Sequence, residues 1–365
     1  MNKNTNITIV ASEFPPQPGG IGNHAYNLAW YLSKENYEVE VITDVRSKDS
    51  VEENVFDKTL PFKVIRINRS RIQVFTYFKR LLISFRRLKN ANVAIATGKF
   101  SLWNVAFCGL FLNFKSLAIV HGTEVNFKSY TLKSSIDKAL LRFDNIIAVS
   151  KYTKSLINHL HRDIVVIPNA INTDKWKGLK SSLILKGNPV LTTVGRISER
   201  KGQLQVIKHL PELIKYYPDI HYHCVGIPSQ IKVCSKIAKE LGVLSYVTFH
   251  GSVDNYTLFS ILNQTDIFVM LSKETSSGDV EGFGIAILEA NLLGIPAIGS
   301  KGCGIEDAIN HDESGILINP KDDKALLRAI NSILNNNEDY RRNALNWAHQ
   351  FNWSTIVKSY LYILK

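Results

Sequence analysis

Residues 267–294 read IFVMLSKETSSGDVEGFGIAILEANLLG and contain a strand, a polar loop and a helix in direct succession. The run Ile267–Met270 is apolar along its whole length, which is typical of a strand covered on both faces of a parallel sheet. The segment Gly284–Leu293 has apolar side chains at the spacing of one helix face. The stretch therefore predicts a βα unit, with the loop that contains Glu281 at the carboxyl end of the strand.

The same alternation of short apolar runs and helical segments extends along the chain in both directions. The runs have the length and the β-branched composition of strands, and the segments between them have the periodicity of helices. This alternation predicts doubly wound α/β domains with parallel sheets. Further predicted strands are Ile7–Val10, Val39–Thr43, Val93–Thr97, Leu117–Val120, Ile146–Val149, Val165–Ile167, Val190–Val194, His221–Val225, Val247–Phe249, Pro296–Ile298 and Gly315–Ile318, and the predicted helices include Asn23–Ser33, Ser101–Leu112, Gln203–Tyr216 and Gln230–Leu241.

A break in this pattern divides the chain into two predicted domains. Pro168 ends a strand-like run, and residues 172–188 are polar and weakly patterned, as in an interdomain linker. We predict an N-terminal domain over residues 1–170, a linker over 171–188 and a C-terminal domain over 189–349, with a final helix at about residues 350–365 that packs back on the first domain. Ligands of open parallel sheets bind outside the carboxyl ends of the strands, so we expect the site in a cleft between the domains.

Composition excludes several classes of protein. The chain has 365 residues, of which 45% are hydrophobic, too many for a disordered protein. No apolar run reaches the roughly 18–20 residues that span a bilayer, and the apolar stretch near the start is too short for a signal peptide, so we expect a cytoplasmic protein. Cys108, Cys224, Cys234 and Cys303 show no close pairing, which predicts reduced, mostly buried thiols and no zinc site.

The net charge of +12 is concentrated in one segment, because no acidic residue lies between Asp57 and Glu124. A helix over Val74–Lys89 is basic and amphipathic, and such helices dock on anionic membranes, where each Lys or Arg contributes about 1 kcal/mol. The alternatives are a solvated basic face over a packed apolar stripe and a nucleic-acid surface, although no nucleic-acid-binding module is recognisable. The residues predicted to dock on a membrane are Arg80, Arg86, Arg87 and Lys89.

Two loops at strand ends have the residue types that bind phosphate groups. PPQPGGIG, at residues 15–22, contains Gly19 and Gly20, which let backbone N–H groups approach a phosphate; a tight structural turn is the alternative. VGRISERKG, at residues 194–202, contains Arg196 and Lys201. A guanidinium and an ammonium suit a diphosphate, unless both are ordinary surface cations.

A third loop, EGFG at residues 281–284, comes just before the helix of the opening stretch. The N–H groups of Phe283, Gly284 and Ile285 are available there for an anion. Glu281 can accept hydrogen bonds from sugar hydroxyls, and Glu289 lies further along the helix. By spacing alone, Glu281 could equally well be a partner of the helix dipole, and Glu289 could equally well lie on a solvated helix face.

Glu281 and Glu289, separated by seven residues, resemble the E-x7-E motif of the retaining glycosyltransferase family 4. Four further segments resemble elements of this family in the family's order: PPQPGGIG its glycine loop, HGTE at His121–Glu124 its His-Gly element, PNAIN at 168–172 its interdomain segment, and VGRISERKG its diphosphate loop. Residues 294–318 resemble the end of its donor domain. The resemblance implies the GT-B fold, with two Rossmann-like doubly wound parallel-sheet domains facing across a cleft.

The resemblance also implies roles for single residues. Arg196 and Lys201 would hold the donor diphosphate, and Glu289 would bind the ribose hydroxyls. His121, which spacing alone would make structural, would lie near the sugar and the reacting carbon. The expected catalytic residues are His121, Glu281, Arg196 and Lys201, and the expected donor-binding residues are Gly19, Gly20, Arg196, Lys201, Glu281, Gly282, Phe283, Gly284, Ile285 and Glu289.

The activity implied is transfer of a sugar from a UDP- or GDP-sugar to a hydroxyl of a glycan or lipid-linked acceptor, with retention of configuration. We expect no cofactor and no metal, because cations and backbone dipoles would stabilise the leaving diphosphate. The basic segment fits a cytoplasmic enzyme that is peripheral on the inner face of the cell membrane, in bacterial surface polysaccharide or glycolipid synthesis, with no nucleic acid as partner. The alternatives are a sugar-nucleotide epimerase or phosphorylase of the same fold and a non-catalytic partner or scaffold protein.

Overall fold

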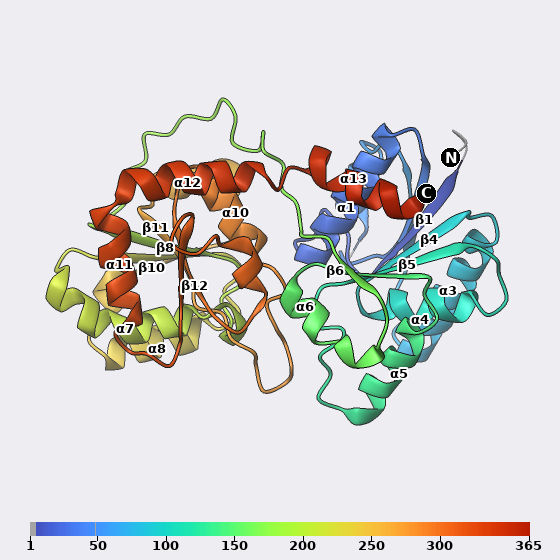
Figure 1. Ribbon diagram of the computed structural model, residues 1–365, viewed down its shortest axis with the longest axis horizontal. Coiled ribbons are helices and arrows are strands. Elements are labelled where there is room, and N and C mark those ends of the chain that lie inside the picture. Colours follow the sequence, from blue (N-terminus) through green and yellow to red (C-terminus); the bar gives the residue numbers. More distant parts are fainter. Residues whose placement is uncertain (1–4, 48) are drawn as a thin grey trace. The chain divides into compact units, whose positions relative to one another are not determined.

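The computed structural model describes residues 5–47 and 49–365. Its residues form two compact units, one of residues 1–170 with 353–365 and the other of residues 171–352 (Figure 1). Residues 171–188, which we expected to be a linker, are grouped with the second unit. The final helix is grouped with the first.

The first unit contains, among the described residues, a seven-stranded sheet in the order β3-β2-β1-β4-β5-β6-β7. Every neighbouring pair is parallel. The order reverses between β1 and β4, as in a doubly wound fold. The strands are β1 Asn6–Ala11, β2 Glu38–Asp44, β3 Lys63–Ile67, β4 Val93–Thr97, β5 Lys115–Val120, β6 Asn145–Ala148 and β7 Ile164–Val166.

Helices cover both faces of this sheet. Helix α1 packs on α13, whereas α3, α4 and α5 pack on one another, and Figure 1 shows the two groups on opposite sides of the sheet. The sheet is therefore buried on both faces, which is why its central strands are mostly apolar. The helices are α1 Gly20–Lys34, α2 Val51–Asp57, α3 Gln73–Leu88, α4 Lys99–Cys108, α5 Tyr130–Leu140, α6 Lys151–Ser155, η1 Asn158–Leu160 and α13 Trp353–Leu364.

The second unit contains, within the described chain, a six-stranded sheet in the order β10-β9-β8-β11-β12-β13. It is also parallel throughout, and its order reverses between β8 and β11. The strands are β8 Val190–Val194, β9 His221–Val225, β10 Val247–Gly251, β11 Ile267–Met270, β12 Ala297–Ser300 and β13 Gly315–Ile318; the helices are η2 Glu199–Lys201, α7 Gln203–Tyr216, α8 Ile231–Glu240, η3 Leu244–Tyr246, α9 Asn255–Leu262, α10 Ile285–Asn291, η4 Gly304–Ala308, α11 Ala325–Asn335 and α12 Asn337–His349.

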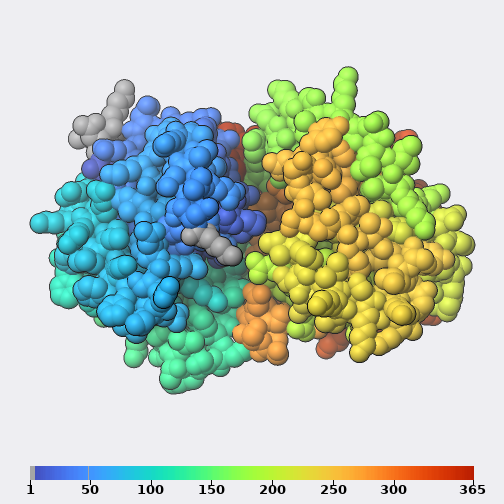
Figure 2. All heavy atoms as spheres, turned by 180° about the vertical axis from the view of Figure 1, so that it is seen from behind, coloured from blue at the N-terminus to red at the C-terminus, as the bar shows by residue number. Residues whose placement is uncertain are grey.

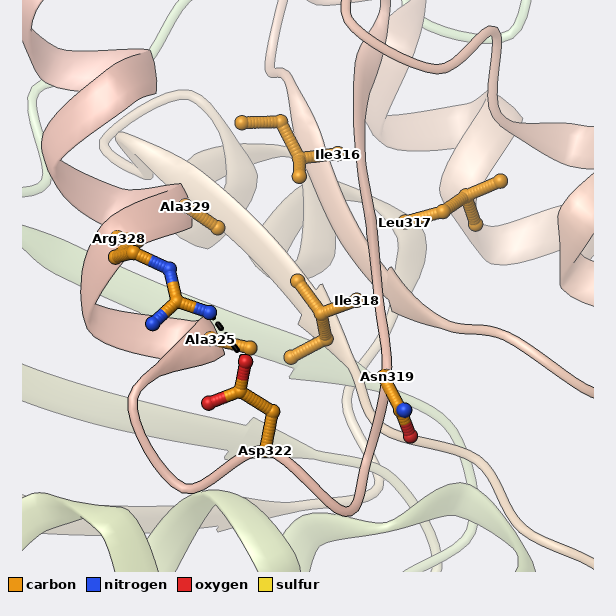
Figure 3. A pocket seen from close by; sticks show the side chains of 8 residues that line it. All are labelled: Ile316, Leu317, Ile318, Asn319, Asp322, Ala325, Arg328 and Ala329. Atoms are coloured by element: carbon orange, nitrogen blue, oxygen red, sulfur yellow. Dashed lines mark hydrogen bonds and ion pairs between the residues drawn. The ribbon is translucent and has the colours of Figure 1, made fainter.

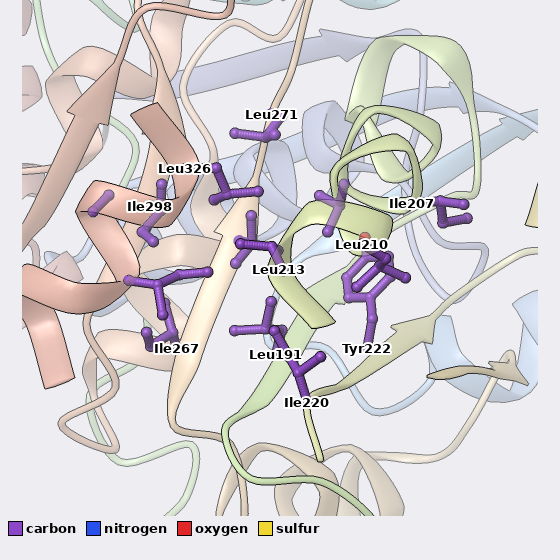
Figure 4. Close-up of a cluster of buried hydrophobic side chains, with 14 of the residues drawn as sticks. Leu191, Ile207, Leu210, Leu213, Ile220, Tyr222, Ile267, Leu271, Ile298 and Leu326 are labelled. Atoms are coloured by element: carbon purple, nitrogen blue, oxygen red, sulfur yellow. The ribbon is translucent and has the colours of Figure 1, made fainter. Parts of the chain in front are cut away.

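A buried apolar cluster fixes the sheet of the second unit against its helices. Leu210 and Leu213 of α7 share this cluster with Leu191 of β8 and Ile267 of β11 (Figure 4). All four are at most 1% exposed. The two strands on either side of the order reversal are thereby held rigidly, and the loops that leave their carboxyl ends start from fixed positions.

The predicted strands are all present, and β3 is an additional one. The cysteines, which all lie in the described residues, are buried and form no disulfide, as predicted. No helix in the described residues is long and apolar enough to cross a membrane.

Candidate active site

Strands β8 and β11 are neighbours, so the loops at their carboxyl ends meet. The backbone N–H of Lys273 donates to the carbonyl of Arg200 at 3.1 Å, and the Lys273 ammonium lies 2.8 Å from the Glu199 carboxylate. Gly202 permits this approach, because its φ is +79° and a Cβ there would lie 1.9 Å from the carbonyl oxygen of Leu271. Two loops far apart in the sequence thus form one surface.

The loop after β8 is held in shape by the buried side chain of Gln203. Its Oε1 accepts the N–H of Ser198 at 3.2 Å, and its Nε2 donates to the carbonyl of Arg196 at 3.2 Å. The Arg196 side chain itself is exposed and pairs with no carboxylate in the part of the chain that the structure describes. It is therefore available to a ligand from solvent.

Lys201 and Glu281, both predicted as site residues, are in direct contact. The Lys201 Nζ lies 2.8 Å from Oε2 of Glu281, and the lysine stem lies along Gly195, where a Cβ would be 3.1 Å from its Cε. Both side chains are largely buried, at 13% and 10% exposure. The ion pair is thus shielded from bulk water and stronger than a surface pair.

Arg200 also belongs to this cluster, although it was not among the predicted site residues. One of its terminal nitrogens contacts the same Oε2 of Glu281, and its Nε lies 3.2 Å from Oδ2 of Asp279. The carboxylates raise the pKa of the Arg200 guanidinium despite its burial. The sequence shows only the residue types, since ERK adds the cation Arg200 before Lys201 and DVE adds the carboxylate Asp279 before Glu281. No local pattern shows that these groups meet.

Glu281 is held ionised by these two cations. Burial by itself would raise the pKa of its carboxyl group, but the charges and hydrogen bonds of Lys201 and Arg200 outweigh burial and lower it. The backbone of Glu281 is fixed as well, because its carbonyl accepts the N–H of Gly304 at 2.8 Å. The result is a fixed, charged acceptor group at the carboxyl end of the sheet.

The glycines after Glu281 turn the chain into α10. Gly284 is the residue before the helix and has φ +95°, a conformation that side chains disfavour. In the described chain, the backbone N–H groups of Phe283, Gly284 and Ile285 donate to no carbonyl oxygen. The buried Phe283 ring packs at 5.9 Å from Phe351, so it can contribute to a site through its backbone and not through its side chain.

Glu289 lies on α10 and pairs with a different cation. Lys175 Nζ contacts its Oε1, and the indole Nε1 of Trp176 donates to its backbone carbonyl at 2.9 Å. The ammonium also lies 4.5 Å from the centre of the Trp176 ring, a cation–π contact. Glu289 was predicted as a site residue, whereas its partner Lys175, in the predicted linker, was not.

In the first unit, the predicted glycine loop begins α1. Gly19 is the residue before the helix, and a Cβ on it would lie 2.1 Å from a carboxylate oxygen of Glu13. Gly20 has no atom within 4 Å of the equivalent position. The helix therefore begins three residues earlier than predicted, directly at the glycines.

His121 follows β5 at the same edge of the sheet. Its Nε2 lies 2.8 Å from the hydroxyl of Thr97 at the end of β4, and its backbone N–H donates to Oε1 of Glu124. Burial lowers the pKa of His121 to about 3 and raises that of Glu124 to about 7. The imidazole is therefore neutral at neutral pH, and His24 packs against it edge-on at 5.1 Å between ring centres.

The prediction for Arg80 is wrong. Its guanidinium pairs with the fully buried Asp44, its side chain is 11% exposed, and it stacks 4.0 Å from the centre of the Phe100 ring. A buried carboxylate needs a counter-charge, so this arginine is committed to the interior. Arg87 lies 3.6 Å from Glu40, while Arg86 and Lys89 are exposed.

Elsewhere in the second unit, eight residues of β13, α11 and the loop between them line a cavity of about 270 Å³ (Figure 3). None of the predicted site residues lines it. In the described residues, no group of three or more His, Cys, Asp or Glu side chains is placed to hold a metal ion.

The fold and the site together define a class of protein. Among solved structures, HepE of Anabaena in complex with UDP and glucose superposes with a TM-score of 0.82 at 18% identity, over 99% of each chain. The two parallel α/β sheets therefore constitute a GT-B fold, as predicted.

The sequence comparisons give the family. Residues 18–175 match the family described as Glycosyltransferase Family 4, and residues 174–347 match Glycosyl transferases group 1. A GDP-mannose-dependent monoacylated alpha-(1-6)-phosphatidylinositol monomannoside mannosyltransferase of Corynebacterium glutamicum is 25% identical over 88% of this chain and 87% of its own. A GDP-mannose-dependent alpha-(1-6)-phosphatidylinositol monomannoside mannosyltransferase of Mycolicibacterium smegmatis is 27% identical, and the match spans 60% of either chain. The chain belongs to glycosyltransferase family 4 and is a glycosyltransferase.

Proposed function

We propose that the chain transfers a sugar from a nucleoside diphosphate sugar to a hydroxyl of a glycan or lipid-linked acceptor, with retention of configuration. The observation that carries this proposal is the ionised Glu281 beside Lys201, at the carboxyl end of a parallel sheet, with the exposed Arg196 on the same loop as Lys201. Relatives named as GDP-mannose-dependent mannosyltransferases and a structural neighbour solved with UDP support a nucleotide sugar as donor.

In this proposal the second unit binds the donor. Arg196 and Lys201 neutralise the diphosphate as it leaves, which is where negative charge develops. Glu281 accepts hydrogen bonds from the sugar, the N–H groups of residues 283–285 face the diphosphate, and Glu289 binds the ribose. The donor binds without a metal, since these groups supply the positive charge.

In this proposal the acceptor binds to the first unit. The neutral imidazole of His121 borders the reacting carbon, and Gly19 and Gly20 leave room for the phosphate and the acceptor. A double displacement needs a carboxylate nucleophile close to the anomeric carbon, and Glu281 is already engaged by two cations. Attack from the face of the leaving group, with the departing phosphate taking the proton, fits these residues better.

We also propose that the first unit contacts an anionic membrane from the cytoplasmic side. Helix α3 is exposed along Val74, Phe75 and Phe78, and Phe111, just after α4, adds a further exposed ring, 6.4 Å from that of Phe85. Figure 2 shows this part of the chain, in light blue, on the outer surface of the unit. Lys79, Arg86 and Lys89 are exposed beside these apolar side chains, a combination that suits an interfacial helix.

A thermal-shift panel of UDP-, GDP- and ADP-sugars tests the donor proposal. A donor at about 100 times its dissociation constant adds about 2.7 kcal/mol, which raises the melting temperature by several degrees. The donor that does so is then incubated with and without acceptors. Epimerisation or phosphorolysis without acceptor would contradict transfer, and binding of no nucleotide sugar would favour a scaffold protein.

Flotation with vesicles tests the membrane proposal. The double variant R86E/K89E should leave anionic vesicles, whereas K236E, which reverses an exposed cation on α8, should stay bound. Replacing Phe78 with Ser should weaken binding to the same vesicles without changing the charge. Equal flotation of all four proteins would refute this contact.

A further inference from the structure

Arg200 and Lys201 neutralise one carboxylate oxygen from two adjacent positions of η2. Both contact Oε2 of Glu281, Lys201 at 2.8 Å. Arg200 also pairs with a second carboxylate, because its Nε lies 3.2 Å from Asp279. In the described chain, Lys201 pairs with Glu281 alone. The guanidinium is thus anchored on both sides, whereas the ammonium is anchored on one.

This difference matters when a diphosphate enters the site. Two phosphate charges attract the Lys201 ammonium more strongly than one carboxylate does. Glu281, with its side chain 10% exposed, would then lose part of its neutralising charge. A buried carboxylate without a counter-charge takes up a proton or moves toward water, and either change removes the acceptor group for the sugar.

We infer that Arg200 is a positioning residue that keeps Glu281 charged and in place while Lys201 turns from Glu281 to the donor diphosphate. The inference rests on the proposed function of this site. The planar guanidinium suits the task, because its fork contacts Glu281 and Asp279 at the same time. A lysine at this position has one ammonium group and cannot span both carboxylates in the same geometry.

Other groups that face Glu281 do not take over this task. The thiol of Cys303, on the loop before η4, has its pKa raised to about 11 by burial and stays neutral. Asp279 carries the same sign of charge as Glu281 and acts on it through Arg200. Without Arg200, Lys201 is the one cation in the described residues that still pairs with Glu281.

The test is the pH dependence of kcat at a saturating concentration of the donor identified by the thermal-shift panel, because kcat reports the ionising groups of the donor-bound enzyme. Removing an opposite charge at contact distance raises a carboxyl pKa by about one unit or more. The variant R200Q should therefore shift the acid limb of kcat upward by about one pH unit, which is a roughly tenfold loss on that limb. R200K restores the charge and should return the acid limb toward that of the wild type, while the plateau value of kcat stays lower.

K273Q is the matched control, because Lys273 pairs with Glu199 on the same loop and does not touch Glu281. Its acid limb should equal that of the wild type. A purely structural ion pair would instead lower kcat equally at every pH in R200Q, and that result overturns the inference. If R200Q does not melt cooperatively, R200M, which keeps the aliphatic stem, repeats the measurement.

The two proposals fail in different ways. A wild type that binds no nucleoside diphosphate overturns the proposed function and this inference with it. A wild type that transfers sugar, combined with an unmoved acid limb in R200Q, overturns the role of Arg200 alone.

Discussion

The Nε2 atom of His24 lies 3.0 Å from the hydroxyl of Tyr360, although the two residues are 336 positions apart in the chain. His24 is on α1 and Tyr360 on α13, and both are at most 1% exposed. The ring of Trp353, also on α13, packs 5.3 Å from that of His24. The last helix is therefore part of the core of the first unit and a neighbour of His121 through His24.

Replacing Tyr360 with Phe should destabilise the first unit. His24 Nδ1 already has no hydrogen-bond partner in the described residues, so the variant would leave both ring nitrogens unpaired in a buried site. An unsatisfied buried polar group costs about 1–3 kcal/mol. Calorimetric melting should show this loss for Y360F. Y362F removes a hydroxyl from the 81% exposed tyrosine on the same helix and should melt like the wild type; equal melting of both variants would contradict the role of this bond.

The strands at the centre of the two sheets could be predicted because their environment is uniform. β1 and β4 are covered on both faces, so most of their positions are apolar and each run is visible in the sequence. β3 was missed because it is a short edge strand in which Lys63 and Arg66 leave no continuous apolar run and no strict alternation. Its identity depends on pairing with β2, which no local pattern reveals.

Site residues could be predicted only where a short sequence motif indicates their role. Lys201 and Glu281 were predicted, and the structure brings them together. Arg200 could not be distinguished from a solvated cation, because its role depends on Asp279 and Glu281, about 80 positions away in the sequence. Arg80 was misplaced for the same reason: its partner Asp44 comes from a different strand, and amphipathic periodicity does not show which cations are buried.

Alanine at Arg196 or Lys201 should lower kcat/KM for the donor by about 100-fold or more, since each removes a charge that stabilises the leaving diphosphate. Steady-state kinetics at fixed acceptor concentration measure this. K208A, at an exposed position on α7, is the matched control and should retain wild-type rates. Wild-type rates in both R196A and K201A would rule out the donor site in the second unit.

Lys175 should affect binding of the nucleotide part of the donor. Its ammonium holds Glu289, the residue proposed to bind the ribose, and Trp176 holds the backbone of the same residue. In K175M the carboxylate loses this anchor, so we expect the bare nucleoside diphosphate to bind several-fold more weakly in calorimetry. K177M, at a side chain that is 81% exposed, should bind it normally. Unchanged affinity in K175M would show that Glu289 does not depend on this pair.

We expect the second unit to lose stability in mild acid, because three histidines lie close together on β9 and β10. His223 Nε2 lies 2.9 Å from the carbonyl of Lys186 and must donate to it, so its Nδ1 accepts the N–H of His250 Nε2 at 3.0 Å. The neighbouring His221 ring is 4.8 Å from that of His223. This chain of hydrogen bonds requires a neutral His223, because a proton on its Nδ1 would face another N–H.

Burial lowers the pKa of all three histidines, and repulsion from neighbouring rings lowers that of His221, to about 4, and that of His250 further. The unfolded chain has histidine pKa values of about 6.5, so below that pH it binds protons that the folded unit does not. Stability is therefore complete above about pH 6.5 and falls as the pH drops toward the folded pKa values. The melting temperature of the second unit should fall over this range, and H250Q should reduce the slope, because a glutamine amide can still donate to His223 but does not titrate. Carboxylates titrate in the lower part of the same range in both proteins, so the comparison isolates the histidines; equal slopes for wild type and H250Q would refute their contribution.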